Sequence, residues 1–69
     1  MNQKELFDKV KNMRKNTVLR IQQSDWDSAY TTPPRVLVAQ WTGERGSLLG
    51  KKFTVKTVPG IEYIITRYE

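Results

Sequence analysis

The 69-residue sequence contains neither cysteine nor histidine, so disulfide bonds and the usual zinc ligands cannot hold its fold together. A chain of this length forms one domain, here residues 1–69, and buries only about 60% of the surface that its unfolded chain exposes. Small domains often compensate with cross-links, metals or self-association. We therefore expect homodimerisation or stabilisation by a bound partner.

The same two absences remove most enzyme mechanisms. The chain has no thiol nucleophile and no side chain whose ordinary pKa lies near neutrality. The sequence therefore predicts a protein that is not an enzyme and that uses no cofactor and no metal. A remote alternative is a metal-dependent enzyme built on Asp25 and Asp27, but the surrounding serines indicate that these carboxylates cap a turn.

The charge balance is strongly basic, with 12 Lys and Arg against 7 Asp and Glu and a net charge of +5. Such an excess attracts polyanions, nucleic acids above all. The longest apolar run, Val36–Ala39, is far shorter than the roughly 18 residues of a membrane span, and the N-terminal residues lack the apolar core of a signal peptide. We expect no membrane partner and a cytoplasmic location.

The first fifteen residues follow a helical period. The apolar side chains that would form one stripe are Leu6, Phe7, Val10 and Met13. Asn2 is a good N-cap, with Glu5 three positions later as in a capping box, and Asn16 can adopt the left-handed conformation that stops a helix. The sequence predicts an amphipathic helix over about residues 2–15.

From residue 17 the apolar pattern changes to the alternation that is typical of strands. The alternating segments are residues 17–22, 35–42, 51–58 and 61–68. We expect a loop at 24–34, turns at 43–46 and around Pro59-Gly60, and either a short strand or a helical turn at 47–50. The predicted class is α+β: the helix, then a β-rich module (17–69) in which an antiparallel meander of about four strands can curl into a partly closed, SH3-like barrel.

Two groups of cations are the candidate nucleic-acid-binding residues. The helix carries Lys9, Lys11, Arg14 and Lys15, and the second half of the chain carries Arg45, Lys51, Lys52, Lys56 and Arg67. Taken singly each is an ordinary surface charge, but outward positions on a strand recur at a spacing close to that of phosphates along a nucleic-acid strand. The leading prediction is a small nucleic-acid-binding protein with electrostatic phosphate contacts and low sequence specificity, DNA and RNA both being open.

The alternative prediction is a protein-interaction module, either a small inhibitor or an adaptor, of a size that is frequent among phage and mobile-element proteins. Its contact would be the loop residues Asp25, Trp26, Asp27 and Tyr30. An exposed Trp or Tyr serves equally well as an anchor in a protein interface and as a stacking platform for a base. The sequence leaves open whether Trp26 is such an anchor or a lid over the core.

Overall fold

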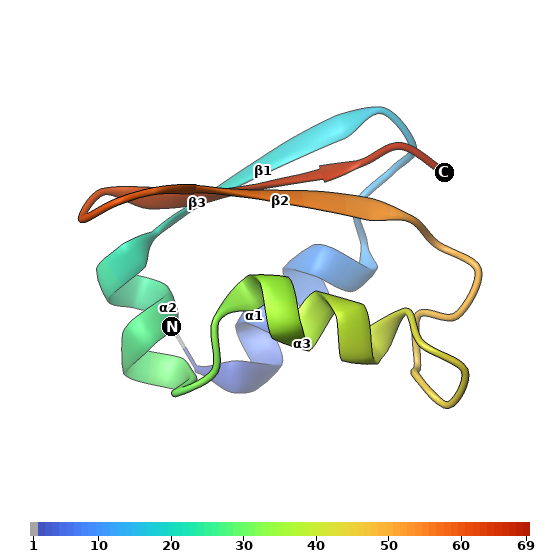
Figure 1. The fold of residues 1–69 in the computed structure, drawn as a ribbon, viewed down its shortest axis with the longest axis horizontal. Helices are drawn as coiled ribbons and strands as arrows, with labels where there is room; N and C mark the ends of the chain where they lie inside the picture. The colour runs from blue at the N-terminus through green and yellow to red at the C-terminus, as the bar shows by residue number, and fades with distance from the viewer. Residues whose placement is uncertain (1) are drawn as a thin grey trace.

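The computed structural model describes residues 2–69 and shows helices on one side of an antiparallel sheet (Figure 1). In chain order the elements are α1 (Gln3–Lys11), β1 (Thr17–Gln22), α2 (Gln23–Ala29), α3 (Pro34–Trp41), β2 (Phe53–Val58) and β3 (Glu62–Arg67). The α+β class is confirmed. The four-stranded meander and the barrel are not, because the described chain forms an open sheet of three strands.

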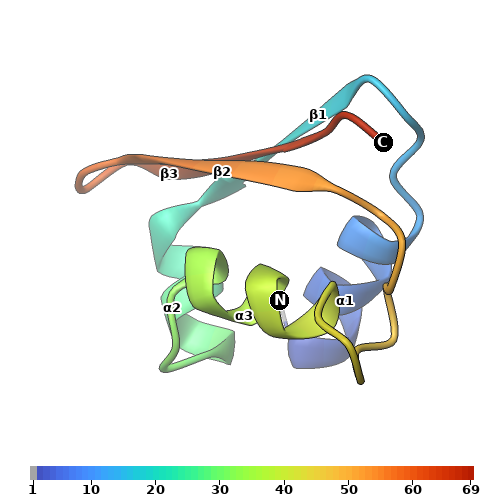
Figure 2. The same cartoon turned by 45° about the vertical axis from the view of Figure 1, so that its right-hand side comes forward.

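The sheet places its last strand in the middle, in the order β1-β3-β2. Both pairs are antiparallel, and one residue of β3 lies between a partner on each side: Ile65, for example, pairs with Leu19 of β1 and with Val55 of β2. All three helices cover the same face of this sheet (Figures 1 and 2). Within residues 2–69 no element covers the other face, which we call the bare face (Figures 1 and 2).

Helix α1 forms where its apolar stripe predicts it. Leu6, Val10 and Met13 are buried, and the Asn2 side chain accepts a hydrogen bond from the Glu5 amide at 2.9 Å, as expected for an N-cap. The helix ends at Lys11, earlier than predicted. Asn16 is left-handed as expected (φ 64°), but in the turn that leads into β1 and not at the end of the helix.

The strand predicted at residues 35–42 is wrong, because this segment is helix α3. Its buried residues, Pro34 and Val38, are one helical turn apart. Pro34 occupies the first turn, where its missing N–H would have had no partner in the helix. A short apolar run such as Val36–Ala39 fits a strand and a helix equally well, and packing against the sheet decides for the helix.

The loop predicted at residues 24–34 is also corrected, since its first half is helix α2. This short helix has no side-chain N-cap and is stabilised by burial of Trp26, which is 0% exposed. The Trp26 indole N–H donates to the Thr32 carbonyl at 2.8 Å, and this bond fixes the connection between α2 and α3.

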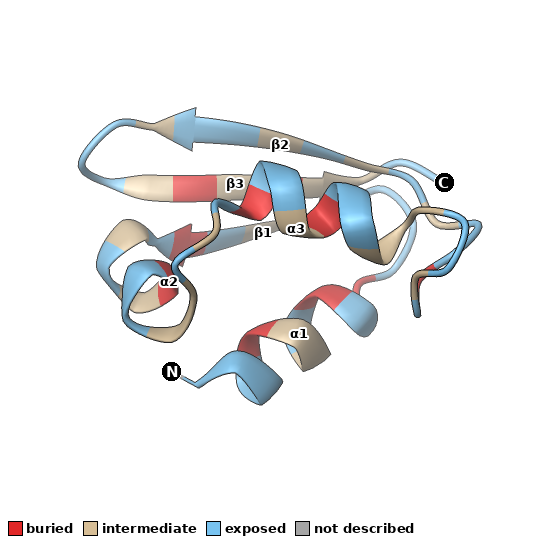
Figure 3. Cartoon of the chain, turned by 60° about the horizontal axis from the view of Figure 1, so that its bottom comes forward, coloured by how far each residue is buried: buried red, intermediate tan, exposed pale blue. Residues whose placement is uncertain are grey.

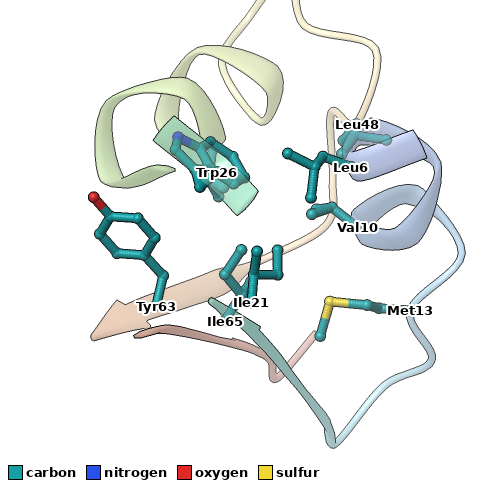
Figure 4. Packing of buried hydrophobic residues seen from close by; sticks show 9 residues of the cluster. Leu6, Val10, Met13, Ile21, Trp26, Leu48, Tyr63 and Ile65 are labelled. Carbon is teal, nitrogen blue, oxygen red and sulfur yellow. The ribbon is translucent and has the colours of Figure 1, made fainter. Parts of the chain in front are cut away.

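The apolar core lies between the helices and the sheet (Figures 3 and 4). Its buried members are Leu6, Val10, Met13, Ile21, Trp26, Val38, Leu48, Tyr63 and Ile65. The Trp26 ring is central, with the ring centroids of Tyr30, Tyr63 and Trp41 at 4.9, 6.1 and 6.3 Å. Among residues 2–69, no helix has the length and apolar content needed to cross a membrane.

The loops after α3 are tight turns. The turn expected at residues 43–46 is present, with the Gly46 amide bonded to the Gly43 carbonyl at 2.9 Å. Residues 47–50 form a further turn and not a strand, with the Lys51 amide bonded to the Leu48 carbonyl at 3.1 Å, and they bury Leu48. The β2–β3 loop, residues 59–61, contains Gly60 with φ 74°, a conformation that suits glycine.

Candidate nucleic-acid interface

Three chain segments that are far apart in the sequence meet at one end of the molecule. The Lys51 ammonium donates to the Lys11 carbonyl at the end of α1 (2.9 Å), and the Arg67 guanidinium of β3 donates to the Met13 carbonyl (2.8 Å). The Asn16 amide bonds to the Arg67 carbonyl at 2.7 Å. The end of α1, the start of β2 and the end of β3 therefore lie side by side, at the right of Figure 1.

This meeting point concentrates positive charge. We call it the basic end and define it by Lys11, Arg14, Lys15, Lys51, Lys52 and Arg67. The single carboxylate side chain in these segments belongs to Glu69, which pairs with Lys52 at 3.2 Å. Both partners of that pair are more than half exposed, so the pair is screened by water and cancels little of the field at longer range.

The six cations of the basic end have two different roles. Lys51 and Arg67 are half-buried and engaged with main-chain carbonyls, so they hold the three segments together. The remaining four are exposed: Lys11, Arg14, Lys15 and Lys52. These four are the groups that the fold leaves available for an anionic ligand.

The other three predicted nucleic-acid-binding residues lie outside the basic end. Lys9 is exposed in the last turn of α1, and Arg45 is exposed in the turn that follows α3. Lys56 is exposed midway along β2, on the bare face of the sheet. The predicted alternation is confirmed over residues 53–56, where Phe53 and Val55 are half-buried while Thr54 and Lys56 are exposed, but it does not continue to the end of β2, since Thr57 is exposed and Val58 half-buried.

The residues of the alternative interaction site do not form an exposed loop. Trp26 is neither an exposed anchor nor a lid but the centre of the core. Tyr30 is half-buried and donates its hydroxyl hydrogen to the Gln3 carbonyl at 2.9 Å, and burial raises the pKa of this phenol. Asp27 accepts a bond from the Tyr63 hydroxyl at 3.3 Å. Asp25 is half-buried on α2, and the described residues contain no group of three or more acidic side chains arranged to hold a metal.

Helices α2 and α3 form an arrangement that the sequence reasoning missed. They are joined by residues 30–33 and run in clearly different directions, α2 upright and α3 horizontal in Figure 1. Two consecutive helices that run in different directions and are joined by a short connection have the outline of a helix-turn-helix arrangement (Figure 1). The signal that could have revealed it was the helical spacing of Pro34 and Val38, together with the position of Pro34 at a helix start.

The outer face of α3 is well suited to contact a ligand. Its exposed residues are Arg35, Val36, Ala39 and Gln40. This face carries one cation, one amide and two small apolar side chains, and the helix contains no carboxylate. A polyanion can therefore approach α3 without meeting a negative side chain of the helix.

Comparison with protein-family models, curated proteins and solved structures finds no match to this chain. Its function is therefore inferred from the geometry described above.

Proposed function

We propose that this protein binds nucleic acid without catalysing a reaction, with the basic end as its main phosphate contact. The observation that supports the proposal is the convergence of α1, β2 and β3, which brings six cations together at one end of the molecule. A local excess of positive charge attracts a polyanion, and the exposed Lys11, Arg14, Lys15 and Lys52 can each approach a phosphate.

The helix-turn-helix arrangement favours duplex DNA as the ligand. In such motifs the second helix lies in the DNA major groove, which is wide enough to admit an α-helix, and the eight residues of α3 span about 12 Å along the helix axis. Its exposed Arg35 and Gln40 have the donors and acceptors that contact guanine and adenine edges. The major groove of duplex RNA is too deep and narrow for this contact.

The first test is fluorescence anisotropy with a labelled DNA duplex, the corresponding single strand and an RNA duplex of the same sequence. Each is titrated at two salt concentrations. We expect the DNA duplex to bind most tightly, with log K falling by about 3–4 per tenfold rise in salt if four phosphates are contacted. Absence of binding to all three at low salt contradicts the proposal.

A pair of matched variants locates the binding surface. Arg14→Gln/Lys15→Gln removes two charges from the basic end, and the control Lys4→Gln/Arg20→Gln removes two exposed charges elsewhere. Each phosphate contact contributes about 0.9 to the salt slope, so we expect the first variant to flatten the slope by about 1.8 and the control to leave it almost unchanged. Equal effects of the two variants would show that binding follows net charge and not the basic end.

The alternative function is not proposed on its original residues. A protein contact centred on Trp26 would require a side chain that the fold buries completely. The specific observation that does favour a protein partner lies elsewhere on the molecule and is independent of the basic end.

A further inference from the structure

A shallow groove lies between the start of α3 and the edge strand β2. It encloses about 570 Å³ and is lined by Pro33, Arg35, Val36, Val55, Lys56 and Thr57. Thr57 has the same orientation along the strand as Phe53 and Val55, which face the helices, yet Thr57 is exposed. The helices therefore leave this corner of the sheet uncovered, and the groove lies over it.

One wall of the groove is a strand edge with unused backbone groups. Among residues 2–69, β2 pairs with β3 alone. The Tyr68 amide donates to the Lys52 carbonyl, so Lys52 directs its backbone groups toward the chain of β3. In an antiparallel pair, hydrogen bonding to one neighbour recurs at every second residue of a strand. Residues 54, 56 and 58 therefore bond toward β3. The N–H and C=O groups of Val55 and Thr57 then point to the free edge, beside the groove.

The side chains around this edge define the chemistry of a ligand. The floor is apolar, formed by Pro33, Val36 and Val55, and Val36 is 43% exposed. Two cations lie beside it: Arg35 comes from α3, and Lys56 from the bare face of the sheet. None of the six lining residues is acidic.

We propose that this groove binds an extended acidic segment of a partner protein, which adds to β2 as a fourth strand. An extended peptide satisfies the free amides and carbonyls of an edge strand, and its alternate side chains fill the adjoining pockets. Residues that point to the helices contact the apolar floor, and acidic residues on the other side face Lys56. A nucleic acid could approach the two cations, but it would use neither the strand edge nor the apolar floor.

The test is an NMR titration of the 15N-labelled chain with a synthetic eight-residue peptide of alternating valine and glutamate. We expect saturable shifts of the Val55 and Thr57 amides and of Val36. Two further versions of the peptide carry N-methyl groups on one or the other set of alternate amides. An added strand uses one set only, so one version should bind like the parent and the other should lose about tenfold or more in affinity, as expected when several hydrogen bonds are removed.

Charge is tested separately with matched variants. Lys56→Glu should weaken binding of the valine–glutamate peptide by about tenfold, whereas Lys4→Glu, an equal charge change at an exposed position at the start of α1, should have little effect. A peptide with lysine in place of glutamate should bind more weakly than the parent to the unmodified protein.

The outcomes that overturn this inference are specific. Failure of the valine–glutamate peptide to shift the β2 amides, or equal binding of both N-methylated versions, excludes strand addition. Shifts of these amides by a DNA duplex but not by the peptide would assign the groove to nucleic acid instead. Arg35 and Val36 belong both to the groove and to the outer face of α3, but Val55 and Thr57 belong to neither the α3 face nor the basic end. Because the peptide titration contains no nucleic acid and is decided by the amides of Val55 and Thr57, its result is distinguishable from the outcome of the DNA-binding test.

Discussion

Trp26 is the residue on which the helix-turn-helix arrangement depends. Its ring is fully buried among Tyr30, Trp41 and Tyr63, and its indole N–H holds the Thr32 carbonyl in the connection between α2 and α3. One side chain thus fills the core and fixes the turn. Its sequence neighbours are polar, and for that reason the sequence alone did not reveal its burial.

We predict that Trp26→Ala lowers the free energy of unfolding by about 3–5 kcal/mol, because it removes the largest buried side chain and leaves a cavity. Trp26→Phe keeps an aromatic ring but leaves the Thr32 carbonyl without its donor, and we expect a loss of about 1–3 kcal/mol. Urea denaturation followed by far-ultraviolet circular dichroism measures both values.

Trp41→Phe is the matched control for this prediction, because Trp41 is half-buried and lies against the same cluster. We expect it to cost less than Trp26→Phe. If the two Phe variants were equally stable, the hydrogen bond to Thr32 would not contribute to holding the turn.

At the scale of elements, local patterns predicted those parts of the fold that local interactions determine. The stripe and cap of α1, the alternation of β1, β2 and β3 and the turn around Pro59-Gly60 all follow from neighbouring residues. Helices α2 and α3 do not. Helix α2 is polar apart from Trp26 and Ala29, and helix α3 contains a short apolar run that either period fits, so tertiary packing decides both.

Like the fold, the candidate site could be predicted from the sequence only in part. Composition identified the cations, and strand alternation identified Lys56 as facing outward. Their convergence depends on contacts such as that between Lys51 and the Lys11 carbonyl, which join segments distant in the sequence. The same packing turned Trp26 from a proposed contact residue into core.

The cap of α1 provides a prediction at this scale. Asn2→Ala removes the acceptor of the Glu5 amide, and we expect it to lower stability by about 1 kcal/mol, measured by urea denaturation. Asn2→Asp is the control, since a carboxylate accepts the same bond and also suits the positive end of the helix dipole. A loss in Asn2→Asp as large as in Asn2→Ala would show that the cap is not the stabilising feature.

At the scale of the whole molecule, β3 connects the other two strands with each other and with the core. It pairs with both other strands and contributes Tyr63 and Ile65 to the core, whereas β1 and β2 each pair on one side. We predict that its amides are the slowest to exchange in a native-state hydrogen-exchange experiment, with protection close to that of global unfolding. Faster exchange of the β3 amides than of the β1 or β2 amides that point away from β3 would contradict this central role.

The order of the strands also has a consequence for the newly made chain. Thr17 pairs with Arg67, and β1 and β2 have no contact with each other in the sheet, so neither can join a sheet before the ribosome has completed β3. Until then only the helical segments can form structure, and the alternating apolar residues of β1 stay exposed. The sheet therefore assembles in one step that waits until residues 62–67 are free to pair, and because this step joins segments as far apart in the sequence as Thr17 and Arg67, we expect it to be slower than formation of the helices.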